Sequence, residues 1–394
     1  MSVLGRSISA IPRTYRQTCM KCLHTTPKSF AASIKKSPRI RQAERKSNAS
    51  SSVGQSTPNF GKERGSFESS LPPTVLLDSA RKSGALNLDS EQALEILREF
   101  QIRGARPTVG WERNLCADFD IQPSTLTALA RILNRCDGKS QRILGTRVKM
   151  TASKLEDAGA TFDLIASYLA HGTMEKNDFS AVLQRLGIMA KQEKKPEAMV
   201  LLGKVLLSQQ RTSEALEWFS KATDHAADIP VVQALNYAGA SEALVQKGRI
   251  LLAMKDRKGA ESAFRTAALD LDDPSGYFYL SQLEESGSTN QEVFLLKAAS
   301  SGIVDACHNL GCIELARADT KLAKSSTKTI EEFGMAREWF QVAAADGFGP
   351  SMINMASICK AAGQHEVALQ WVERAESLPD TAEQAKNLRI QWQT

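Results

Sequence analysis

The chain has 394 residues, enough for one or two domains with a sizeable core, and only 6% of them are aromatic, which favours alanine-rich helices over sheets. Its net charge is +6, but residues 1–43 hold nine basic residues and no acid, so the remaining 351 carry 41 basic against 44 acidic residues. This nearly neutral body gives no charge argument for nucleic-acid binding, and the lack of any run of 18 apolar residues predicts no membrane-spanning helix.

Residues 1–43, rich in Arg, Ser and Thr, are predicted to be a mitochondrial targeting presequence. On a helical wheel their first apolar side chains gather on one side and two arginines lie opposite, although Pro12 would weaken such a helix. The phrase KCLHTTPKSFA resembles the region just after the processing site of many fungal mitochondrial precursors, which places cleavage near Cys22–Ala31. A disordered basic tail is the alternative. We therefore expect a protein of the mitochondrial matrix, and peripheral association with the inner membrane stays open.

Two regions precede the repeats. Residues 44–70 are expected to be a disordered linker, because a stretch rich in Ser, Asn, Gly and Lys buries too little apolar surface to fold. Residues 71–195 show helical patterns and no alternating strand pattern; start signals at Asp89 and Pro123 are matched by stop signals at Gly104 and Gly138. Further helices are expected over residues 141–150, 160–171 and 178–191. This N-terminal helical region either continues the repeats that follow or forms a separate domain.

Residues 196–380 contain five repeats of one template. A small residue lies midway along each first helix: Gly203, Gly248, Ser281, Gly311 and Ala356. On each second helix a large apolar residue precedes an alanine by three positions: Phe219/Ala222, Phe264/Ala267, Leu295/Ala298, Phe340/Ala343 and Val372/Ala375. These alanines are 45, 31, 45 and 32 residues apart, so the unit is about 31 residues and the two long intervals contain insertions.

The template has a packing explanation. A glycine on the first helix lets the second helix approach closely, and the aromatic ring fills the groove beside it. One helix pair cannot bury its apolar face alone, so neighbouring pairs must stack. The sequence therefore predicts an all-α fold, an α-solenoid of stacked helical hairpins preceded by a disordered leader.

The interruptions and the end of the repeat region are also predicted. Residues 224–240 contain the apolar phrase VVQALNYA and are expected to add a helix, whereas residues 317–332 are expected to form a polar surface loop. Residues 381–394 should form a polar helix that caps the last repeat.

The phrases LGCIELA, AREWFQVAAADG and AFRTAALD, with the ending AAxxG, resemble tetratricopeptide and Sel1-like repeats over about half of the chain. This resemblance implies a helical-repeat fold and a non-catalytic adaptor or scaffold that holds a polypeptide in a groove. Mitochondrial proteins with a similar layout of presequence and repeats include assembly factors for respiratory complexes, cytochrome oxidase among them. The implied partner is therefore a peptide or the tail of an inner-membrane subunit.

The first helices of successive repeats should line the binding groove. The residues expected there are Val200, Lys204, Val245, Arg249, Phe278, Gln282, His308, Cys312 and Ile353. They give an apolar surface with two cations at one end, which suits an apolar segment carrying an acid. The Lys and Asn clamp by which such repeats hold the tails of cytosolic heat-shock chaperones is missing, so that partner is not expected. Alternatively the groove is filled by the N-terminal half of this chain, and these residues are core.

No pattern of catalytic, cofactor-binding or metal-binding residues is found, so the protein is predicted not to be an enzyme and to need no cofactor. None of the five histidines lies in a known catalytic or metal-binding motif, and His308 is interpreted as a hydrogen-bonded histidine of the groove rather than a catalytic one. Cys19 and Cys22 form a single CxxC pair inside the leader, without a second pair at zinc spacing. The other five cysteines are expected to be small buried residues.

RNA binding by helical repeats is the alternative function, because many such proteins act in mitochondrial gene expression. It requires a basic stripe along the groove. Lys204 and Arg249 begin one, but Gln282, Cys312 and Ser357 follow at the equivalent positions, so nucleic acid is not the favoured partner.

Overall fold

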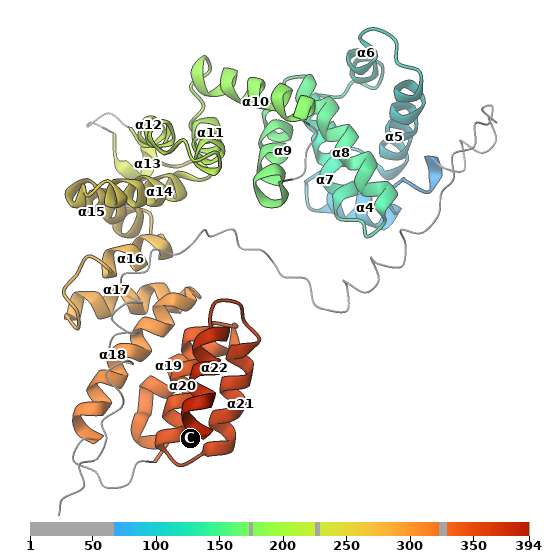
Figure 1. Ribbon diagram of the computed structural model, residues 1–394. Helices are drawn as coiled ribbons and strands as arrows, with labels where there is room; N and C mark the ends of the chain where they lie inside the picture. The colour runs from blue at the N-terminus through green and yellow to red at the C-terminus, as the bar shows by residue number, and fades with distance from the viewer. Residues whose placement is uncertain (1–66, 173–175, 225–228, 323–328, 394) are drawn as a thin grey trace, which may run out of the picture. The chain divides into compact units, whose positions relative to one another are not determined.

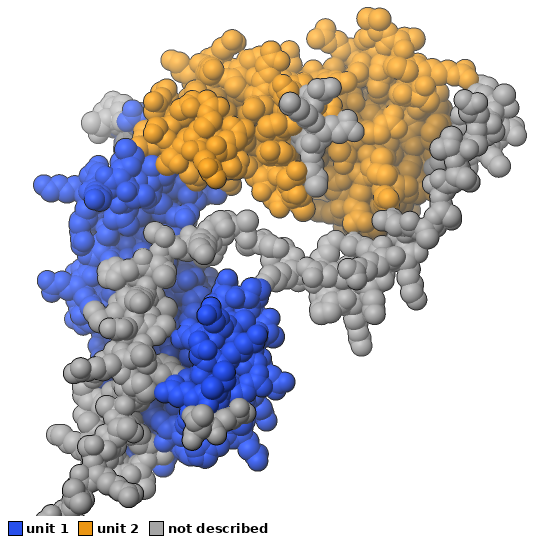
Figure 2. All heavy atoms as spheres, in the orientation of Figure 1, with its two compact units in different colours: residues 1–29, 223–394 blue, residues 30–222 orange. Residues whose placement is uncertain are grey.

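The structure is a computed structural model that describes residues 67–172, 176–224, 229–322 and 329–393. Within these ranges the chain forms helices joined by turns and no β-strand, which confirms the predicted all-α fold. The described residues divide into an N-terminal unit, residues 67–222, and a C-terminal unit, residues 223–393, coloured separately in Figure 2. The predicted presequence and most of the predicted linker lie outside the described residues.

The N-terminal unit consists of helices only (Figure 1). They are α4 (Thr74–Lys82), α5 (Ser90–Ala105), α6 (Trp111–Asp118), α7 (Pro123–Asn134), α8 (Lys139–Lys154), α9 (Ala158–His171), α10 (Lys176–Lys191), α11 (Pro196–Ser208) and α12 (Thr212–Thr223), whose last residue is counted with the other unit. The expected start of α5 is confirmed, since the Asp89 carboxylate caps this helix by accepting a hydrogen bond from the amide of Gln92 at 2.8 Å.

Two short helices of this unit, α4 and α6, were not expected from the sequence. Each has at most nine residues, too short to be stable alone, so tertiary packing must hold it. In α6 the ring of Trp111 meets Phe100 edge-on at 5.3 Å between centroids, and Leu115 is fully buried. Packing of this kind is set by distant partners and leaves no periodic pattern in so short a segment.

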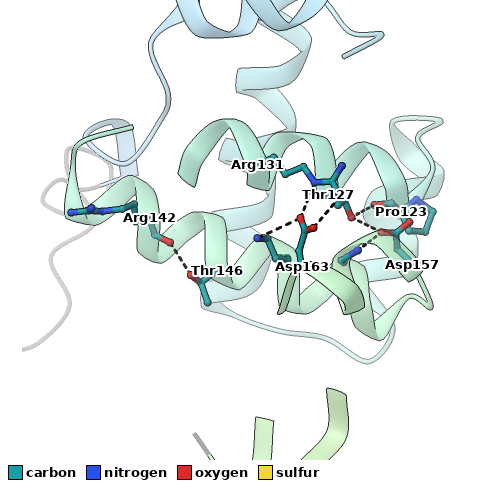
Figure 3. A network of polar contacts seen from close by, with 9 residues as sticks. Pro123, Thr127, Arg131, Arg142, Thr146, Asp157 and Asp163 are labelled. Carbon is teal, nitrogen blue, oxygen red and sulfur yellow. Dashed lines mark hydrogen bonds and ion pairs between the residues drawn. The ribbon is translucent and has the colours of Figure 1, made fainter. Parts of the chain in front are cut away.

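A network of polar contacts joins α7, α8 and α9 (Figure 3). The Arg131 guanidinium donates to both carboxylate oxygens of Asp163, at 2.7 and 3.1 Å, and the ammonium of Lys149 lies 3.6 Å from the same carboxylate. The Asp157 carboxylate accepts from the Thr127 hydroxyl and from the amide of Ala160, both at 2.7 Å. One acid thus anchors two helices to α9, while the other caps α9 and holds it to α7.

The C-terminal unit is a succession of helical hairpins that each contact the next (Figure 1). Its elements are α13 (Val231–Ala234), α14 (Ala240–Ala253), α15 (Arg257–Arg265), the π-helical η1 (Thr266–Asp270), α16 (Pro274–Ser281), α17 (Thr289–Ser300), α18 (Val304–Leu322), the 3₁₀ turn η2 (Glu331–Phe333), α19 (Gly334–Ala345), α20 (Gly349–Ala361), α21 (His365–Glu376) and α22 (Ala382–Gln393). No helix among the described residues combines the length and the apolar character needed to cross a membrane.

The predicted glycine–aromatic contact is confirmed in three hairpins. A Cβ added at Gly203 or Gly311 would lie 2.7 Å from the nearest ring atom, closer than real Cβ contacts come, and one at Gly248 would lie closer still. The pairs are Gly203 with Phe219, Gly248 with Phe264, and Gly311 with Phe340. All three rings are fully buried, so the missing side chain is what admits the ring and sets how close the two helices lie.

The AAxxG phrases correspond to one kind of helix end. After α17, Gly302 has φ +86°, and the amides of Gly302 and Ile303 donate to the carbonyls of Ala299 and Ala298 at 2.9 and 3.1 Å. After α19, Gly347 has φ +87° and takes part in the same pair of bonds. This is the Schellman arrangement, in which a left-handed residue turns the chain back and satisfies the last carbonyls.

Two expectations for the insertions can now be judged. The extra helix near residue 231 is confirmed as the single turn α13. The polar loop expected from Arg317 is wrong for residues 317–322, because α18 continues through Leu322. Arg317 bonds Glu314 and Glu292, so ion pairs support this polar continuation of the helix. Residues 323–328 lie outside the described residues.

Candidate partner-binding surface

The nine residues predicted to line a groove belong to both units. Val200 and Lys204 lie on α11 of the N-terminal unit. Of the other seven, six lie on α14, α16, α18 and α20 of the C-terminal unit, and Gln282 directly follows the end of α16. Five of the nine are buried in the hairpins: Val200, Val245, Phe278, His308 and Ile353. The four half-buried ones are Lys204, Arg249, Gln282 and Cys312. A partner would therefore meet mainly the polar members of the predicted set.

Arg249 is the cation of this set in the C-terminal unit. Its guanidinium carbon lies 5.7 Å from the centroid of the Tyr279 ring, and its Nη1 donates to Gln246 Oε1 at 3.1 Å. Among the described residues no carboxylate lies within ion-pair distance of it. The ring of Tyr279 is itself held by stacking on Phe264 at 5.0 Å, so the cation rests on a fixed aromatic surface.

Two residues that were not predicted complete this part of the surface. Burial raises the pKa of Tyr279, while Arg249 lowers it and the nearby Asp305 raises it further. Burial also raises the pKa of Asp305, and the amide of Asp305 itself opposes that shift. We call Arg249, Tyr279 and Asp305 the Arg249 cluster; its members come from α14, α16 and α18, the first helices of three successive hairpins.

His308 is hydrogen-bonded, as predicted, but it is buried instead of lining an open groove. Its Nδ1 lies 2.8 Å from Ser351 Oγ, and Cys312 Sγ lies 3.5 Å from its Nε2. The rings of Phe340 and Phe348 flank it at 5.5 and 5.0 Å. Burial lowers the pKa of His308 to about 4, so the imidazole is neutral near pH 7. A base this weak and this enclosed is suited to holding α18 against α20 rather than to activating the Cys312 thiol.

The described residues contain no group of three or more His, Cys, Asp or Glu side chains that could hold a metal ion. Cys136, Cys307 and Cys359 are buried, as expected, whereas Cys116 and Cys312 are half-buried. Burial raises the thiol pKa of Cys116, Cys136, Cys307 and Cys359, which keeps these thiols in their unreactive protonated form. The CxxC pair at Cys19 and Cys22 lies outside the described residues.

Comparison with known proteins identifies no family for this chain. No family model matches the chain, and no curated protein matches it. Among solved structures, the chain is similar to a Sel1 repeat protein from Oxalobacter formigenes, with 17% sequence identity and a TM-score of 0.43, over 72% of this chain and 92% of that one. A similarity with so low a TM-score supports no further conclusion, so the helical-repeat fold rests on the hairpin contacts of this chain.

Proposed function

We propose that this protein is a non-catalytic scaffold that binds a polypeptide partner on the face formed by the first helices of its C-terminal hairpins. The observation that carries the proposal is the Arg249 cluster, in which a half-buried arginine rests on a tyrosine ring without a carboxylate partner among the described residues. A cation in this position offers a charge-assisted hydrogen bond to an incoming carboxylate or carbonyl.

The cluster offers complementary groups to a polypeptide. The Arg249 guanidinium donates only, while the Asp305 carboxylate accepts, so together they match the alternating carbonyl and amide groups of an extended chain. Stacking of Tyr279 on Phe264 fixes the surface before the partner arrives, which lowers the entropy cost of binding. An acidic side chain on the partner would add an ion pair with Arg249.

For the location and the biological role we propose the mitochondrial matrix and the assembly of an inner-membrane respiratory complex such as cytochrome oxidase. The support for location is the acid-free, Arg-rich stretch of residues 1–43. The support for the role is the pairing of such a leader with helical repeats, together with a cluster suited to the tail of an unassembled subunit. Peripheral contact with the inner membrane follows if that tail is membrane-anchored.

The binding proposal is tested by Arg249→Glu in the full chain. The variant should keep its helical circular dichroism and lose the partner that co-purifies with the parent protein from organelles. The matched control is Arg374→Glu, since Arg374 also lies over an aromatic ring, Trp371 at 4.3 Å, but on the exposed side of a second helix. Undiminished partner recovery with folded Arg249→Glu would place the binding surface elsewhere.

The location is tested independently. Sequencing the N-terminus of the protein isolated from mitochondria should give a start near residues 22–31, because the leader is expected to be removed after import. Finding Met1 on the organellar protein, or finding the protein only in the cytosol, would contradict the proposed location without touching the binding proposal.

A further inference from the structure

Helix α8 of the N-terminal unit carries a concentration of positive charge. Its sixteen residues include five cations and no acid, although residues 67–222 as a whole are nearly balanced, with 21 basic and 19 acidic residues. Lys149 is buried and paired with Asp163. The other four cations are exposed, and at 100° per residue they fall within about 140° of one another: Lys139, Arg142, Arg147 and Lys154. We call these four residues the α8 stripe.

The stripe is not neutralised by the protein itself. Within the described ranges no carboxylate lies within ion-pair distance of any of its four cations. Neighbouring arginines behave differently, since Arg98 pairs with Glu68, Arg103 with Asp118 and Arg131 with Asp163. The stripe therefore presents four exposed cations, none with a carboxylate of the described residues within ion-pair distance.

The start of α8 adds to this surface. Its N-cap residue, Gly138, offers no side-chain hydrogen bond, the first turn holds no acid, and Lys139 occupies the first helical position. A helix N-terminus favours negative charge, so a lysine there is unfavourable in the isolated protein. A bound anionic group would relieve that unfavourable interaction and satisfy free amides of the first turn.

Apolar side chains between the cations indicate which kind of partner the stripe could bind. Ile143 is 54% exposed and Met150 is half-buried, and both lie on the same side of α8 as the stripe. No aromatic side chain occurs on this helix to stack on bases, and the nearby Trp111 is engaged with Phe100. Cations with aliphatic groups between them complement a polypeptide that alternates acidic and aliphatic residues.

From these observations we infer that the α8 stripe is a second binding surface, separate from the Arg249 cluster, and that it takes an acidic amphipathic segment of a partner protein. From Lys139 to Lys154 the helix rises by about 22 Å, the length of about four helical turns or about seven extended residues of a partner. The inference does not depend on the proposed function of the C-terminal unit.

The test measures binding of a labelled peptide of repeated Glu-Glu-Leu triplets, long enough to span α8, to the full chain by fluorescence anisotropy. The parent should bind it, and the apparent affinity should fall as salt is raised. The double variant Arg142→Glu with Arg147→Glu should weaken binding by tenfold or more, because two attractions become repulsions. The matched control, Lys255→Glu with Lys258→Glu, changes two exposed lysines of the C-terminal unit by the same charge and should bind as the parent does.

Further arms keep the result interpretable. Arg142→Gln with Arg147→Gln removes the charges without reversing them, so it serves if the glutamate variant fails to fold. A single-stranded oligouridylate and vesicles of phosphatidylcholine with phosphatidylserine are measured against the same variants. Equal peptide affinity in parent and stripe variants would overturn the inference, and so would a stripe that binds the RNA or the vesicles more tightly than the peptide.

Discussion

At the scale of single residues, the contact between the two helices of a hairpin could be predicted from the sequence because both partners lie within one repeat. Gly203 and Gly248 face rings that follow them at the same offset of 16 residues, and Phe340 keeps the second-helix pattern that pairs it with Gly311, so periodicity identified the partners. The Arg249 cluster escaped prediction for the opposite reason. Tyr279 lies beside Arg249, and Asp305 lies close enough to Tyr279 to raise its pKa, only because of how each hairpin packs against the next. No spacing within one repeat encodes that packing.

We predict that Gly311→Leu lowers the free energy of unfolding by about 1–3 kcal/mol, because its side chain would overlap the Phe340 ring. Gly187→Ala is the control, since it is also a helical glycine but has nothing within 4 Å of the added Cβ, and it should stabilise α10 by about 0.5–1 kcal/mol. Urea denaturation measures both. Equal stability of Gly311→Leu and the parent would show that the two helices do not pack as described.

A second prediction concerns a turn with an unfavourable residue. Lys255 has φ +67° between α14 and α15, and the equivalent turn between α20 and α21 has Gly363 at φ +76° with the same pair of backbone bonds. Lys255→Gly should stabilise the protein by about 0.5–1 kcal/mol, because glycine adopts this left-handed conformation without steric cost. Gly363→Lys should destabilise it by a similar amount. Thermal denaturation should show a higher melting temperature for Lys255→Gly and a lower one for Gly363→Lys. Melting temperatures that shift in the same direction would contradict this explanation.

His308 predicts a pH dependence. Its pKa is about 4 in the folded protein against an ordinary value of 6.5, so between these values the unfolded chain binds more protons and stability rises with pH. The contribution is fully present above pH 6.5 and falls by on the order of 3 kcal/mol as the pH approaches 4. His308→Gln should flatten the difference in stability between pH 7 and pH 5, measured by urea denaturation. Parallel pH profiles of variant and parent would refute this.

At the scale of elements, long amphipathic helices were predictable and their ends less so. The helix of the fourth repeat was expected to stop before Arg317, because its polar continuation has the composition of a surface loop. Ion pairs to Glu314 and Glu292 support the helix there instead, and the second of these partners comes from α17. Charged stretches of this kind can be assigned only when the neighbouring helix is known.

The polar network of the N-terminal unit gives an element-scale prediction. Asp163→Asn should destabilise the unit by about 2 kcal/mol, since it removes the partner of the largely buried Lys149 and of Arg131. Lys149→Met should change stability by less than about 1 kcal/mol, and Asp163→Asn should cost less in that background. Urea denaturation of the four proteins completes the cycle. An identical cost of Asp163→Asn in both backgrounds would mean that Lys149 and Asp163 do not interact.

At the scale of the whole molecule, the repeat pattern identified the fold but only part of the candidate surfaces. Five predicted groove residues are buried. The position in the repeat assigned them to the groove, but that position also faces the adjacent helices, whose side chains cover it. The nearly neutral net charge likewise concealed the α8 stripe, since summation over the chain cancels a local excess. Which charges remain unpaired is decided by distant neighbours.

The end of the stack gives a prediction at this scale. Helix α22 covers the last hairpin through the buried Leu388, while Lys386 of the same helix is exposed. Leu388→Asp should lower the melting temperature and promote self-association, because it places a charge in the apolar contact between α22 and the last hairpin. Lys386→Asp should change the free energy of unfolding by less than about 0.5 kcal/mol and should not promote self-association. Light scattering measures self-association and thermal denaturation measures stability. If both variants are monomeric and equally stable, α22 does not act as a cap.

The insertion after α18 has a consequence for folding kinetics. The ring-on-glycine contact joins residues 16 positions apart in the hairpins of Gly203 and Gly248, but 29 positions apart in that of Gly311. Closing the longer loop costs about 0.5 kcal/mol more in chain entropy, so this hairpin should nucleate about twofold more slowly than the others. The hairpin of α18 and α19 would then form last, after the hairpins on either side of it. Shortening the insertion should accelerate the last phase of folding.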